Sequence, residues 1–76
     1  MDVVEIIEIW ADDFGLDLLW GHDDEDTANQ HFIEVHGGRD YQRAIDDLDF
    51  VLNRIGYVVD MAYDYKGGVR IEISRN

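Results

Sequence analysis

The sequence predicts a single α+β domain over residues 1–76, with two helices packed against an antiparallel four-stranded sheet in the order α-β-β-α-β-β. Three observations predict this fold class. A chain of 76 residues is too short for two domains. Apolar residues recur at helical spacing in two segments, and they alternate with polar residues in two segments near the C-terminus.

Residues 2–14 are predicted to form the first helix, because Asp2, Glu5 and Glu8 recur about every three residues. One side of this helix is then apolar: Val3, Ile7, Trp10 and Phe14. Asp2 is expected to cap the helix and Gly15 to end it. Three β-branched isoleucines lower the helix propensity, so a strand is the alternative for this segment.

The middle of the chain predicts two strands and a second helix. A short apolar strand is expected over residues 16–21, an acidic loop over 22–26 and a second strand over 27–36, which two glycines end. Asp40 is expected to cap the second helix, and Gly56 to end it. Its apolar stripe is Tyr41, Ala44, Ile45, Leu48, Leu52 and Ile55.

The last two segments, 57–65 and 69–74, alternate as the strands of a hairpin do. The alternation places five residues on one face of the first of these strands: Tyr57, Val59, Met61, Tyr63 and Tyr65. It favours packing of this face against the core over its use as an aromatic binding strip. A three-residue loop, 66–68, is predicted because it keeps apolar residues on one face. It sets Tyr65, Tyr63 and Met61 opposite Val69, Ile71 and Ile73, and Asp64 opposite Arg70.

The formal net charge of −12 is the extreme feature of the sequence, and it is uneven. Residues 1–38 hold eleven acidic residues and no lysine or arginine, whereas residues 39–76 hold seven acidic and six basic residues. Such a surface repels nucleic acids and anionic membranes and attracts basic proteins. We therefore expect a basic protein partner, no direct nucleic-acid binding and no membrane binding. An acidic N-terminus and the lack of a long apolar run predict a cytoplasmic location.

No catalytic, metal or cofactor site is predicted. The chain has no cysteine, and strand parity places His31 and His36 on opposite faces. An EF-hand ladder starting at Asp23 has Ala28 where glycine is required. The chain has one serine and one threonine, and no nucleophile–base pair is recognisable. We therefore expect a protein that is not an enzyme.

The partner-binding surface is expected where acidic residues lack basic neighbours, with Trp20 as an exposed aromatic anchor. The residues predicted to form it are Asp12, Asp13, Asp17, Trp20, Asp23, Asp24, Glu25 and Asp26. The second helix should be more balanced, because Arg43 and Asp47 are spaced for an ion pair. Dimerisation is one way to complete so small a core.

In size, acidity and α+β pattern, and most of all in the run His22-Asp23-Asp24-Glu25-Asp26, the chain resembles phage-encoded inhibitors of host defence, the anti-CRISPR and anti-restriction proteins of DNA-mimic type. The resemblance is one of overall character and carries no shared motif. It implies an inhibitor that blocks the DNA-binding surface of a CRISPR effector or nuclease in the host cytoplasm. Two alternatives remain open: an acidic antitoxin, immunity or adaptor protein with a basic partner, and a halophilic domain whose acidity is salt adaptation.

Overall fold

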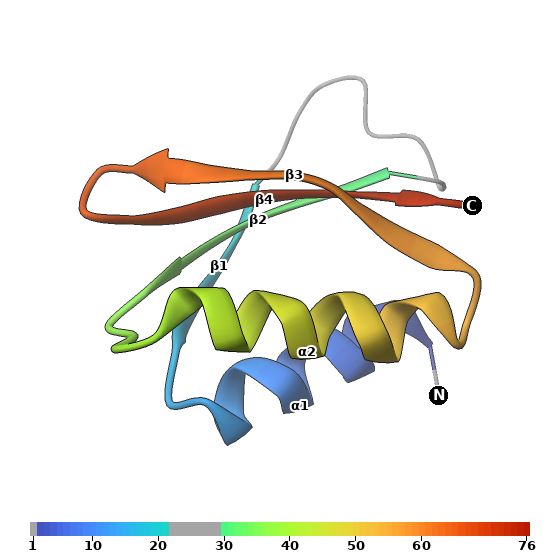
Figure 1. Cartoon of the computed structure of the whole chain (residues 1–76), viewed down its shortest axis with the longest axis horizontal. Helices are drawn as coiled ribbons and strands as arrows, with labels where there is room; N and C mark the ends of the chain where they lie inside the picture. The colour runs from blue at the N-terminus through green and yellow to red at the C-terminus, as the bar shows by residue number, and fades with distance from the viewer. Residues whose placement is uncertain (1, 22–29) are drawn as a thin grey trace.

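The computed structural model describes residues 2–21 and 30–76, and it confirms the predicted element order. The elements are α1 (Val3–Asp13), β1 (Asp17–Gly21), β2 (Gln30–His36), α2 (Tyr41–Asn53), β3 (Tyr57–Tyr65) and β4 (Gly68–Arg75). All neighbouring strands are antiparallel, in the spatial order β1-β2-β4-β3. Both helices cover the same face of the sheet, so the domain has a helical layer and a sheet layer (Figure 1).

The predicted caps define where both helices begin. Asp2 Oδ1 accepts a hydrogen bond from the backbone N–H of Glu5 at 2.9 Å, and Asp40 Oδ1 accepts one from that of Arg43 at 3.1 Å. Each bond satisfies a backbone donor that has no partner within its helix, which contributes about 1 kcal/mol. Gly15 follows α1 with a φ of 65°, the left-handed conformation that glycine adopts without strain.

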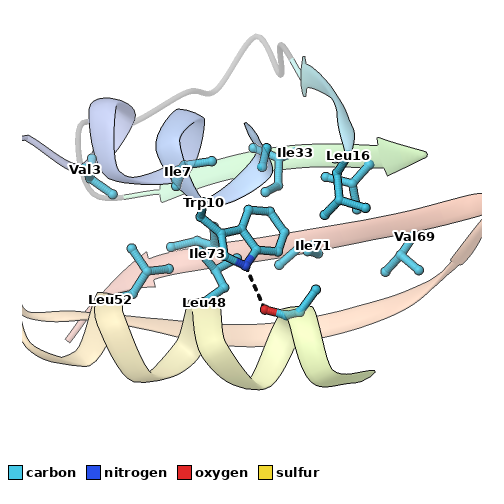
Figure 2. Close-up of a cluster of buried hydrophobic side chains, with 13 residues drawn as sticks. Val3, Ile7, Trp10, Leu16, Ile33, Leu48, Leu52, Val69, Ile71 and Ile73 are labelled. Carbon is cyan, nitrogen blue, oxygen red and sulfur yellow. Dashed lines mark hydrogen bonds between the residues drawn. The ribbon is translucent and has the colours of Figure 1, made fainter. Parts of the chain in front are cut away.

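The core lies between the two layers and takes the predicted apolar stripe from each helix. Ile7, Leu48 and Ile71, from α1, α2 and β4, are completely buried within it. The Trp10 indole Nε1 donates a hydrogen bond of 2.7 Å to the Ala44 carbonyl oxygen, which joins the two helices inside the core (Figure 2). Ile55, predicted to complete the α2 stripe, is exposed because the helix ends at Asn53.

The turn of the β3–β4 hairpin differs from the prediction. Tyr65 pairs with Gly68, so the loop contains two residues, Lys66 and Gly67, rather than three. Both have positive φ, 50° and 82°, which is typical of a type I′ turn. The predicted pairing of Asp64 with Arg70 is therefore wrong, because Asp64 lies opposite Val69.

A β-bulge in β3 corrects the predicted buried row. Val59 pairs with Ile73 but Met61 pairs with Glu72, so Asp60 is an extra residue in its strand. Asp49 Oδ1 of α2 accepts a hydrogen bond of 3.1 Å from the Val59 backbone N–H beside the bulge. An extra residue reverses which face each later side chain occupies. Tyr57 and Val59 therefore lie on the helix side of the sheet, whereas Met61, Tyr63 and Tyr65 lie on its other side.

Candidate partner-binding surface

The outer side of α1 carries a row of carboxylates. Val3, Ile7, Trp10 and Ala11 bury one side of this helix against the core, so the acidic residues between them point to solvent. Glu5, Glu8 and Asp12 are all exposed and follow one another at intervals of three and four residues. At this spacing neighbouring Cβ atoms lie about 5–6 Å apart. Asp13 is exposed beside them, so the helix offers several negative charges within a short length.

The predicted acidic residues of the N-terminal half are not all brought together. Asp12 and Asp13 lie on α1, but Asp17 pairs with His36 and lies on the side of the sheet away from the helices. Asp23, Asp24, Glu25 and Asp26 lie outside the described residues, so they remain candidates from the sequence alone.

Trp20 is not the exposed aromatic that the sequence predicted. It lies opposite Ile33 on the helix side of the sheet, half-buried and packed against the core. Its ring makes an edge contact with the His31 ring at a centroid distance of 6.4 Å. The exposed position next to it belongs to Leu19, which is 56% exposed. The parity of a five-residue strand is set by its pairing with β2, which the sequence does not specify.

The basic side chains do not neutralise the acidic ones. Arg54 lies over the Phe50 ring at 5.9 Å, Lys66 over the Tyr65 ring at 5.1 Å, and Arg70 over both Phe32 and Tyr65 at 5.9 and 5.4 Å. In the described part of the chain, no lysine or arginine forms an ion pair, and the one contact of this kind is between His36 Nε2 and Glu34 Oε2. The predicted Arg43–Asp47 pair is not formed.

An apolar groove between α1 and α2 adjoins the acidic row. Its volume is about 400 Å³, and its walls include Ile6, Ile9, Val51 and Ile55. Ile9 is 45% exposed, and Phe50 on α2 is 64% exposed. Asp13 of α1, Asp47 of α2 and Arg54, the C-cap residue of α2, also line the groove. Sequence reasoning missed Ile9, although a helical wheel places it on the side of α1 opposite the core.

The second helix and its flanks, residues 39–54, hold four acidic residues and three arginines, so they are nearly balanced in charge. Asp49 is half-buried and holds the backbone of β3, as described above. Asp46 Oδ1 accepts a hydrogen bond of 3.1 Å from Gln42 Nε2. A larger hollow of about 770 Å³ beside the start of α2 is lined by charges of both signs, which include Arg39, Arg43, Asp46 and Asp47. Among the described residues, the carboxylates of α1 are therefore the ones with fewest basic neighbours.

Within residues 2–21 and 30–76, no three histidine, aspartate or glutamate side chains are grouped closely enough to hold a metal ion. No helix in this part of the chain is both long and apolar enough to cross a membrane.

No protein-family model matches the chain, and no curated protein is significantly similar to it in sequence.

Proposed function

We propose that this protein acts by binding, and that it inhibits a nucleic-acid-handling protein such as a CRISPR effector or nuclease by occupying its DNA-binding surface. The observation that carries the proposal is the set of exposed carboxylates on α1, which have no arginine or lysine within ion-pair distance. In this proposal the carboxylates of α1 occupy the positions of phosphates in a basic groove, together with the loop acids Asp23 to Asp26.

The electrostatic argument is that of a protein–DNA interface with the acidic side supplied by a protein. A groove that binds DNA holds arginine and lysine side chains at a high local density, and it attracts any surface with a matching row of negative charge. Exposed carboxylates without internal partners lose no existing ion pair on binding. Such an interface accelerates association and weakens as salt increases.

The groove between the helices offers apolar contacts, which can raise the affinity for a partner beyond what charge alone provides. Complementary charges determine orientation and association rate, whereas affinity comes mostly from desolvated apolar contacts. Ile9 is an exposed apolar residue that lines the groove, which Asp13, Asp47 and Arg54 border. Phe50, also exposed, lies against Arg54. A basic partner with an apolar side chain at the centre of its surface would fit this combination.

The first experiment is a pull-down from lysate at low salt, repeated with an excess of duplex DNA. We expect recovery of a DNA-binding protein that the DNA displaces, because both ligands occupy one surface. Capture that excess DNA leaves unchanged would contradict the mimicry and favour an antitoxin or adaptor role. A domain that folds only in molar salt, measured by circular dichroism, would instead indicate salt adaptation.

The second experiment compares two variants of equal charge against the captured partner. Glu8→Gln with Asp12→Asn removes two carboxylates from α1, and Asp60→Asn with Asp64→Asn removes two exposed ones from β3. At about 1 kcal/mol per exposed interfacial carboxylate, the α1 variant should bind about thirtyfold more weakly, as measured by calorimetry. The β3 variant should bind within about threefold of the unmodified chain. Equal losses in both would show that only total charge matters.

A further inference from the structure

The side of the sheet turned away from the helices, here called the open face, carries an apolar patch. We call this patch the open-face patch, and its members are Leu19, Phe32, Met61, Tyr63 and Tyr65. Met61 is 53% exposed and Tyr63 is 38% exposed. An antiparallel sheet with helices on one face ordinarily presents polar side chains on the other. Clustered large apolar residues there indicate an interaction surface.

The strand pairing places the patch around a central arginine. Arg70 on β4 has Tyr63 beside it on β3 and Glu34 beside it on β2. Its guanidinium lies over the rings of Phe32 and Tyr65, which belong to strands on either side. The arginine side chain therefore lies along the aromatic rings and helps to make one continuous surface of them.

The charge of the open face determines which occupant it favours. Among the described residues its charged side chains include Arg70, Lys66, whose Nζ lies over the Tyr65 ring, and three carboxylates, Asp17, Glu34 and Glu72. Glu34 is hydrogen-bonded to His36. A basic partner would meet Arg70 at the centre, and a nucleic acid would meet the carboxylates. A second copy related by a two-fold axis would bring the same mixture of charges, and in such an interface Arg70 of each copy can face a carboxylate of the other.

Repulsion between two chains of charge −12 also selects this face. Helix α1, whose carboxylates point to solvent, lies on the opposite side of the sheet from the open face (Figure 1). Contact through the open faces therefore keeps the sheets of both copies between the two acidic rows. The core of one copy is small, with thirteen buried apolar residues among those described, and domains of this size often gain stability by association.

We propose that two copies of this chain associate through their open faces, with both helical layers outward. The contact is a sheet-on-sheet packing, with Met61 and Tyr63 buried between the copies. It leaves the acidic row and the groove of each copy accessible, so the dimer presents two such surfaces in opposite directions. This inference does not depend on the identity of any partner.

Sedimentation equilibrium of the full chain tests the proposal in about 0.5 M salt, which shortens the range of the repulsion to a few ångströms. We expect a mass of twice 8.8 kDa at protein concentrations of about 0.1 mM and above, typical of a small interface. A chain that remains at 8.8 kDa up to about 1 mM overturns the proposal.

Two lysine substitutions at exposed apolar positions show which layer forms the contact. Met61→Lys places a charge in the open-face patch, and Ile9→Lys makes the same change in the helical layer. Burial of an unpaired charge should raise the dimer dissociation constant at least about tenfold for Met61→Lys and leave it unchanged for Ile9→Lys. The reverse order would place the contact on the helices. Circular dichroism checks that both variants fold.

A spin label gives a direct map of the interface. Because the chain has no cysteine, Met61→Cys introduces the single labelling site. In a mixture of labelled chain and unlabelled ¹⁵N chain, the label should broaden the amide signals of Leu19, Phe32 and Arg70 and spare those of α1. Broadening confined to α1, or absent throughout, would contradict the open-face dimer. If the face serves a different protein, the chain stays monomeric and Met61→Lys weakens capture of that protein instead.

Discussion

The helical layer and the sheet layer share one core but present different surfaces. The helices with their flanking residues 2–13 and 39–54 hold nine acidic residues and three arginines, a balance of −6. The described strands and the turn of the hairpin hold five acidic residues and three basic ones, a balance of −2. Two of the three basic side chains of the sheet layer, Lys66 and Arg70, lie over aromatic rings. Among the residues that the structure describes, the acidity is therefore concentrated on the helical layer, and the sheet layer has the aromatic and mixed-charge character of a contact surface.

Because both layers pack on one core, we expect a cavity created in that core to destabilise the whole domain. Leu48 is completely buried on α2, where the two layers meet. Leu48→Ala should lower the free energy of unfolding by about 2–5 kcal/mol, because the layers close only partly around the cavity. That loss is a large part of the stability of a small domain. Urea unfolding followed by circular dichroism measures it.

Phe50→Ala on the same helix is the control, since this side chain is largely exposed. Its cost should be below about 1 kcal/mol. Equal costs for the two variants would mean that α2 does not bury Leu48 between the layers.

The contact between Asp49 and β3 connects the helical layer with the aromatic face. Asp49→Ala removes the acceptor for the Val59 backbone N–H and should cost about 1–2 kcal/mol. Because this bond lies at the bulge, the amide signals of residues 59–63 should shift most. Asp46→Ala, at an exposed position of the same helix, should leave those signals in place.

The smallest predicted effect is a gain in stability at the turn of the hairpin. Lys66 has a φ of 50°, which asparagine adopts more readily than lysine. Lys66→Asn should raise the free energy of unfolding by about 0.5 kcal/mol, provided that the lost contact with the Tyr65 ring is small. A loss of stability in thermal unfolding would argue against the type I′ turn.

The parts of the fold that the sequence predicted well depend on local periodicity. The caps Asp2 and Asp40 were predicted correctly, and so were the apolar stripes of both helices apart from Ile55, which lies beyond the end of α2. Each helix buries one side of a regular 3.6-residue repeat. For the same reason, the exposed positions of Asp12 and Asp13 on α1 follow from the sequence. These features need no knowledge of what the helix packs against.

The features that were predicted wrongly from the sequence depend on contacts between distant segments. The bulge at Asp60 lies beside the hydrogen bond that Asp49 of α2 accepts from the Val59 backbone N–H. The bulge reversed the faces of Met61, Tyr63 and Tyr65. Lys66 has a positive φ although it is not a glycine, so the sequence did not indicate a two-residue turn at this position. The alternation rule assumes an unbroken strand, and it therefore could not predict that these aromatic side chains lie on the open face.

The same bulge affects the tendency of the domain to aggregate at high protein concentration. Among the described strands β3 is an outermost one, so its outer backbone N–H and C=O groups have no neighbouring strand. A long, straight strand in that position is a template for fibril growth. The irregularity at Asp60 bends this template and places a negative charge on it, and Asp64 adds a second charge four residues later. The feature that turns the aromatic side chains outward thus also hinders uncontrolled polymerisation along the edge of the sheet.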